Sequence, residues 1–153
     1  MTEPLQHSFF PEVFHNRIFL ITLSVWFLAQ ATKVLLAIFK EKRFDFRWFI
    51  GTGGMPSSHA AGVAALATSV GLGYGFDTAL FAIAASFALV TMFDAQGVRR
   101  STGQQAGILN KMMEDIYWKG QVEEKRLKEL VGHTPIQVLA GLIFGVICAV
   151  VLN

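Results

Sequence analysis

Four long stretches of apolar, almost uncharged residues constrain the fold of this 153-residue chain more than any other feature. They cover residues 18–39, 59–76, 78–93 and 134–152, and the first contains a single charge, Lys33. A soluble helical bundle needs polar outer faces, which these stretches lack. Such segments are typical of membrane-spanning helices. We therefore predict an all-α fold, a polytopic membrane helical bundle of about four transmembrane helices.

The composition supports a membrane protein, because 53% of the residues are hydrophobic and only 16% are charged. The two middle stretches are shorter than the roughly 20 residues of a perpendicular span. The glycine-rich run 71–75 between them predicts the bend of a helical hairpin. Cys148 is the one cysteine, so the chain forms no internal disulfide. No internal repeat is evident, and we interpret residues 1–153 as a single membrane domain.

Charge placement predicts an orientation. Residues 40–58 and 94–133 contain 11 of the 13 lysines and arginines. With four spans both segments lie on the same side, which the positive-inside rule makes cytoplasmic. We expect an integral protein of the plasma membrane if the chain is prokaryotic, with the membrane and no nucleic acid as partner.

The connection at 104–131 predicts an amphipathic helix at the membrane interface. Its apolar residues recur at three- and four-residue steps: Ile108, Leu109, Met112, Met113, Ile116 and Tyr117. Such a stripe usually means anchoring or packing, and guiding an acyl chain is the alternative.

A serine pair and a histidine stand where the second apolar stretch begins. Ser57, Ser58 and His59 follow a flexible glycine pair and Met55-Pro56. The first amides of a helix have no partner within the helix and carry the positive end of its dipole, so they are suited to hold a phosphate. The simpler interpretation is that one serine only caps the helix.

Charged side chains in or beside apolar stretches are costly and are candidates for function. Lys33 lies within the first stretch, and Asp94 ends the third and precedes Arg99 and Arg100. Two structural alternatives remain open. For Lys33 the structural alternative is that it reaches the interface by snorkelling. For Asp94 it is an ion pair with an arginine.

A second histidine, His133, stands at the boundary between the long connection and the last span, and Gln137 follows one turn later. An interfacial histidine that caps a helix is the ordinary interpretation. Under the four-span topology, however, His59, His133, Lys33 and the arginines meet at one membrane face. This combination indicates phosphoryl chemistry.

Three motifs in this order resemble the divergent type 2 phosphatidic acid phosphatases, described as acid phosphatase/vanadium-dependent haloperoxidase related proteins. They are Gly-Gly-Met-Pro-Ser-Ser-His at 53–59, Asp-Ala-Gln-Gly-Val-Arg-Arg at 94–100 and Gly-His-Thr-Pro-Ile-Gln-Val at 132–138. The resemblance extends from about Gln30 to the end of the chain. It implies a metal-independent phosphatase of membrane lipids, with a phosphorylated lipid as substrate and no cofactor.

The resemblance also implies roles for the two histidines. His133 would attack phosphorus and form a phosphohistidine, and His59 would protonate the leaving oxygen.

Cations and amides would bind the phosphate oxygens, again by resemblance. Lys33 matches the first-motif lysine, Ser57 and Ser58 lie in the second motif, and Arg99 or Arg100 would belong to the third. No compact cluster of Asp and His argues for a metal.

This sequence departs from the wider superfamily around the nucleophile. Gln137 stands where an aspartate would orient His133, and Arg100 lies 33 residues before His133 instead of close to it. Glutamine forms hydrogen bonds but supplies no charge. Asp94 is a candidate to supply the missing carboxylate. The alternative function is a noncatalytic membrane protein that keeps the fold for anionic-lipid binding or assembly. Four spans also suggest a homodimer.

Overall fold

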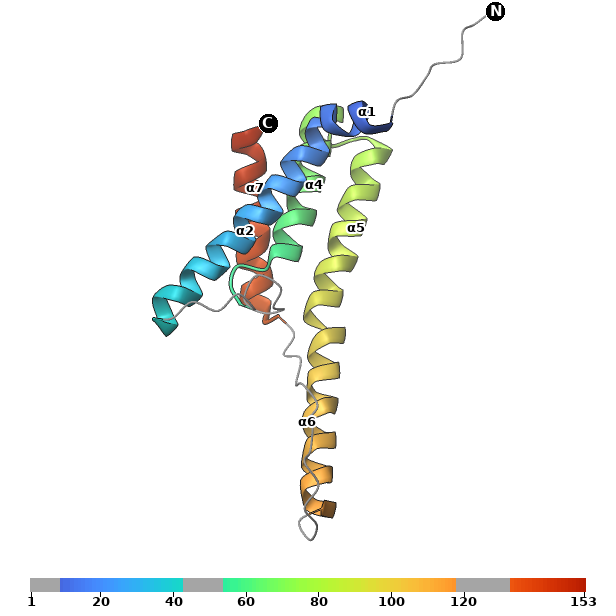
Figure 1. Cartoon of the computed structure of the whole chain (residues 1–153). Helices are drawn as coiled ribbons and strands as arrows, with labels where there is room; N and C mark the ends of the chain where they lie inside the picture. The colour runs from blue at the N-terminus through green and yellow to red at the C-terminus, as the bar shows by residue number, and fades with distance from the viewer. Residues whose placement is uncertain (1–8, 43–53, 118–132) are drawn as a thin grey trace, which may run out of the picture.

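A computed structural model describes residues 9–42, 54–117 and 133–153, and these ranges contain helices without any strand (Figure 1). The side chains at 9–10, 98–102, 104 and 114–117 are outside this description. The helices are α1 (Phe9–His15), α2 (Arg17–Glu41), α4 (Ser58–Tyr74), α5 (Ala79–Gln96), α6 (Val98–Tyr117) and α7 (Pro135–Leu152). The all-α prediction is confirmed, and the four apolar stretches correspond to α2, α4, α5 and α7.

Local capping residues explain where three of these helices begin. Asn16 accepts a hydrogen bond from Phe19 N at 3.0 Å and starts α2, and Thr78 caps α5 in the same way. At α7, Thr134 and Gln137 form a capping box, in which each side chain bonds the other residue's backbone. Short polar side chains therefore mark the helix starts.

The glycine-rich bend between α4 and α5 is confirmed. Gly75 ends α4 with φ of 100°, a conformation that L side chains rarely adopt. A Cβ atom there would also lie 2.7 Å from Asp77 Oδ1. The two helices consequently run in opposite directions.

Helix α4 is the centre of the bundle and packs against α2, α5 and α7 (Figure 1). Its buried positions are almost all small, including Ala61, Gly62 and Ala65. Small side chains let neighbouring backbones approach closely, which is the main packing device in lipid. Val25 and Ala149 from α2 and α7 complete the core on one side of α4.

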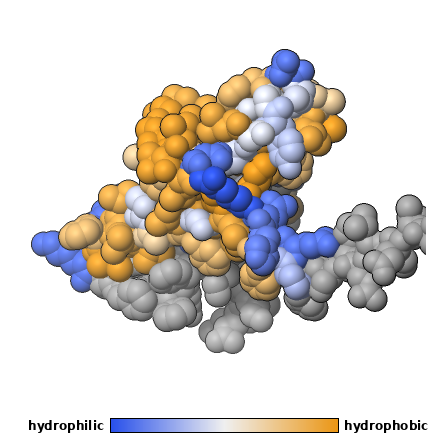
Figure 2. All heavy atoms as spheres, turned by 90° about the horizontal axis from the view of Figure 1, so that it is seen from above, coloured by the Kyte–Doolittle hydropathy of each residue, from blue (hydrophilic) through white to orange (hydrophobic). Residues whose placement is uncertain are grey.

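The outer surface of the bundle is apolar. Helices α2, α5 and α7 are long and apolar enough to cross a membrane, and less than a third of each span is buried inside the bundle. Helix α4 has 17 residues and lies between them. Figure 2, which looks from above, shows broad hydrophobic areas over the sides of the molecule. A surface of this kind requires a lipid environment.

The amphipathic helix is present but begins earlier than predicted. It starts at Val98, directly after α5, and continues the direction of α5 beyond the bundle (Figure 1). Ile108, Leu109 and Met112 are exposed on it. The prediction placed this helix at 104–131, and residues 118–131 lie outside the described residues. The backbone continues from α5 into α6 because Gly97, between them, adopts a right-handed helical conformation.

Candidate functional site

The serines and histidines of the predicted site lie at one end of the bundle. The end of α5, the start of α4 and the start of α7 meet there, as the alternating helix directions in Figure 1 show. Two backbone bonds fix the junction: Ser57 N donates to Gln137 O, and His133 N donates to Ala95 O, both at 3.1 Å. Segments about 40 to 80 residues apart in sequence are thus held together by the main chain.

Ser57 begins α4 and is completely buried. Its hydroxyl accepts a hydrogen bond from Ala60 N at 3.3 Å, which is the ordinary N-cap arrangement. Ser58 is buried beside it with 4% of its surface exposed. The capping interpretation of Ser57 is therefore correct for the hydroxyl, and phosphate binding by the first amides of α4 stays a prediction.

His133 is buried directly before α7, with 3% of its surface exposed. Its Nδ1 atom lies 3.3 Å from Gln137 Oε1, which also accepts from Thr134 N at 3.0 Å. An amide oxygen at Nδ1 favours the tautomer with the proton on that nitrogen. Nε2 then keeps its lone pair, as a nucleophilic imidazole requires.

The two histidines of the sequence motifs are neighbours. Their ring centroids lie 6.1 Å apart, with the ring planes tilted by 58°. His59 is half-buried in the first turn of α4. Residues 74 positions apart thus form a pair of rings at contact separation.

Lys33 lies on α2 and is buried, with 8% of its surface exposed. Its stem passes the loop that leads into α4, because a Cβ on Gly54 would lie 2.9 Å from both Cγ and Cδ of Lys33. Gly54 also has φ of +87°, so two independent constraints favour glycine there. The stem of the lysine therefore packs against the loop that precedes the serine-histidine motif.

Gln30 is a buried polar residue outside the three sequence motifs. It lies one turn before Lys33 on α2, with 6% of its surface exposed. A polar side chain inside an apolar span, three residues from a lysine, was the signal that could have identified it.

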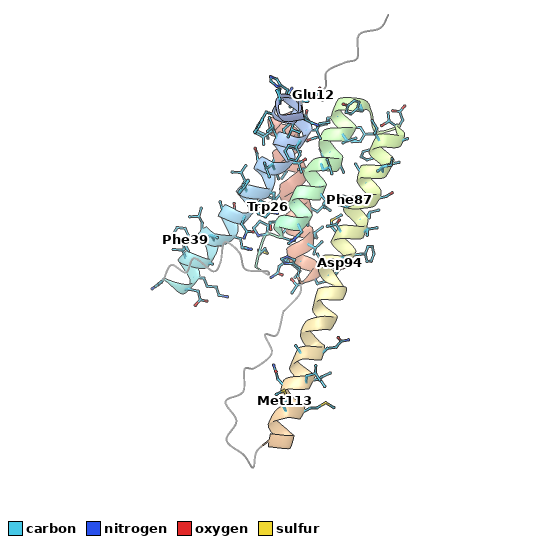
Figure 3. All side chains as sticks on the ribbon, turned by 45° about the vertical axis from the view of Figure 1, so that its right-hand side comes forward. Glu12, Trp26, Phe39, Phe87, Asp94 and Met113 are labelled. Atoms are coloured by element: carbon cyan, nitrogen blue, oxygen red, sulfur yellow. The ribbon has the colours of Figure 1, made fainter. Side chains whose placement is uncertain are left out.

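The remaining predicted residues lie on α5 and α6. Asp94 is exposed near the end of α5, level with the start of α7 (Figure 3). Arg99 and Arg100 are in the first turn of α6, and their side chains are outside the described residues. Their assignment to the phosphate stays a prediction, as does the role of Asp94.

A metal site is not evident among the described residues, where no three His, Cys, Asp or Glu side chains are placed to share an ion. The expectation of a metal-independent, cofactor-free site stays a prediction. The available chemistry is that of two imidazoles, a buried ammonium group and the amides of a helix start.

Comparisons with known proteins agree with the three motifs. The family described as "Divergent PAP2 family" matches residues 14–148. The "Uncharacterized membrane protein YuiD" of Bacillus subtilis (strain 168) is 41% identical over 152 residues, which cover 92% of this chain and 96% of that protein. No solved structure matches. The chain is therefore a membrane protein that belongs to the divergent PAP2 family.

Proposed function

We propose that this protein is a membrane phosphatase that hydrolyses a lipid phosphate monoester through a phosphohistidine intermediate. The observation that carries the proposal is the pair of His59 and His133, 6.1 Å apart at the end of a membrane bundle. Reacting atoms sit about 3–3.5 Å apart in a near-attack arrangement. A phosphoryl group that lies against the edges of both rings can therefore meet both imidazoles.

In the first step, Nε2 of His133 attacks phosphorus, the N–P bond forms and the P–O bond to the lipid alcohol breaks. His59, as an imidazolium, gives its proton to the leaving oxygen. In the second step, neutral His59 takes a proton from water, the water oxygen attacks phosphorus and the N–P bond breaks. The products are the lipid alcohol and inorganic phosphate, and both histidines return to their starting states.

Cationic and amide groups supply the charge stabilisation. Lys33 would bind the phosphate oxygens from the α2 side, and its burial strengthens such an interaction because few water molecules screen it. The amides at Ser58 and His59 begin α4 and form the positive end of its dipole. Arg99 and Arg100 would approach from α6.

One observation favours the noncatalytic alternative. Gln137 Oε1 is shared between His133 Nδ1 and the cap of α7, and it supplies no negative charge to stabilise an imidazolium. A site in which Gln137 orients His133 but does not stabilise a positive charge on it could bind an anionic lipid without hydrolysing it. Asp94 would have to change its exposed position to replace the missing carboxylate.

The experiment is phosphate release by the purified protein in liposomes, without divalent metal. The substrates are phosphatidate, phosphatidylglycerophosphate and a polyprenyl phosphate. We expect release from at least one lipid, and loss of release in both His133→Ala and His59→Ala. His15→Ala is the matched control, because His15 is exposed on α1 at the opposite end of the bundle.

The absence of release from every lipid by the folded wild type would overturn the proposal in favour of anion binding. Release that survives His133→Ala would exclude this histidine as the nucleophile. Cytoplasmic placement of the motif loops and a homodimeric state belong to the same proposal, and neither is needed for the histidine chemistry.

A further inference from the structure

An apolar groove runs along α4 between α2 and α5. Its volume is about 490 Å³. The groove exists because α2 and α5 both pack against α4 but, over their described length, do not contact each other. Gly62 forms part of the floor and has no side chain to fill the space. Trp26 and Phe87, labelled in Figure 3, belong to the two flanking helices.

The lining of the groove suits a hydrocarbon. Most of it consists of large apolar side chains, among them Leu23, Trp26, Leu66 and Phe87. The Thr91 hydroxyl is occupied by a bond to Phe87 O at 2.8 Å, so it offers little to a polar ligand. Water finds few partners in such a space. Leu23 and Phe87 are also partly exposed on the apolar outer surface, so the groove is accessible from the bilayer.

One end of the groove is His59, which belongs to the candidate catalytic pair. The apolar groove and the cationic, histidine-containing site are therefore continuous. A molecule that fits both parts has an anionic head and an aliphatic tail. A water-soluble phosphate ester would leave the groove unused, and an entering helix, about 10 Å across, is too wide for a space of this volume.

We propose that this groove holds a hydrocarbon chain of the substrate, which enters from the bilayer between α2 and α5 while its phosphate lies against His59 and His133. The groove is open along its length, and its volume is enough for part of one long chain. The inference rests on the proposed function and adds a binding site for the chain beside the phosphate.

The first test compares two phosphate monoesters, hexadecyl phosphate and butyl phosphate, by their kcat/KM. Val63 lines the groove, so Val63→Trp fills it. Val90→Trp makes the same change on α5 outside the groove, where Val90 is 67% exposed. We expect the hexadecyl-to-butyl ratio to fall about tenfold or more in Val63→Trp and to keep its wild-type value in Val90→Trp. Equal hexadecyl-to-butyl ratios in both variants would refute the binding of the chain in the groove.

The second test does not depend on turnover or on a variant that folds. Wild-type protein in liposomes is incubated with an alkyl phosphate that carries a photoreactive diazirine at the chain end, and the labelled residues are identified by mass spectrometry. Labels concentrated on Leu66, Leu23 and Phe87 support the groove. Labels spread evenly over the outer surface, including Val90, would refute it. Failure of both monoesters to react, with labels in the groove, would reject hydrolysis but retain the chain site.

Discussion

The close contact between α4 and α7 positions the two histidines, and Gly141 and Gly145 permit it, of which Gly141 lies nearer the histidines. A Cβ atom at Gly141 would lie 2.9 Å from Ala60 Cβ and 3.2 Å from the carbonyl carbon of Ser57. Ordinary contacts of this kind begin at about 3.4 Å. In Gly141→Ala the helices must therefore separate by about 0.5 Å or more, at the position where Ser57 N bonds Gln137 O.

The loss of stability that we expect in Gly141→Ala follows from this overlap. Inserting a methyl group into a well-packed contact typically costs about 1–3 kcal/mol. The effect on hydrolysis should be larger, because a misplacement near 1 Å can lower a rate about 100-fold. We therefore expect Gly141→Ala to unfold at a lower temperature than the wild type and to lose about tenfold to 100-fold in phosphate release.

Gly73→Ala is the matched control, because its added Cβ would meet only Ile18 Cδ1 at 3.7 Å. The same substitution in an open helical position gains up to about 1 kcal/mol from reduced backbone entropy in the unfolded chain. Both variants are compared in detergent by thermal unfolding and in liposomes by phosphate release. Equal unfolding temperatures and equal rates for the two variants would refute the packing argument.

Three further predictions test the site. Lys33→Met keeps the apolar stem and removes the charge, so it should lower kcat/KM about tenfold to 100-fold, the equivalent of one charged hydrogen bond. The same change at the exposed Lys111 should leave kcat/KM unaltered. Equal kcat/KM in the two variants would exclude Lys33 from phosphate binding. Gln137→Glu preserves the capping box and adds a carboxylate beside His133 Nδ1, so kcat should rise about tenfold or more, and an unchanged kcat would separate Gln137 from the nucleophile. Addition of EDTA should leave phosphate release unchanged, and loss of release that Mg²⁺ or Zn²⁺ restores would contradict a histidine-only mechanism.

The helices could be predicted from the sequence because apolar runs and helix caps are local signals. The stretch 134–152 agrees with α7 to within one residue, since Thr134 and Pro135 mark its start. The start of α6 at Val98 was missed, because a glycine usually ends a helix whereas Gly97 here continues it. Local signals therefore gave the elements but not every junction.

The geometry of the site depends on contacts that no local pattern encodes. The motifs predicted that His59 and His133 share a membrane face, but their proximity depends on how closely α4 and α7 pack. The burial of Gln30 also depends on which side of α2 meets α4. Apart from Gln30 and Lys33, the largely apolar surface of α2 gives little indication of that side.

The central claim is that His133 is a nucleophile, and trapping its phosphoryl adduct tests this most directly. Protein in liposomes is mixed with the lipid phosphate that it hydrolyses fastest, quenched at alkaline pH and analysed by mass spectrometry. We predict a phosphoryl group on the peptide that contains His133, absent from His133→Ala and present in His15→Ala. Phosphate release without any adduct on His133, or an adduct on another residue, would contradict the account.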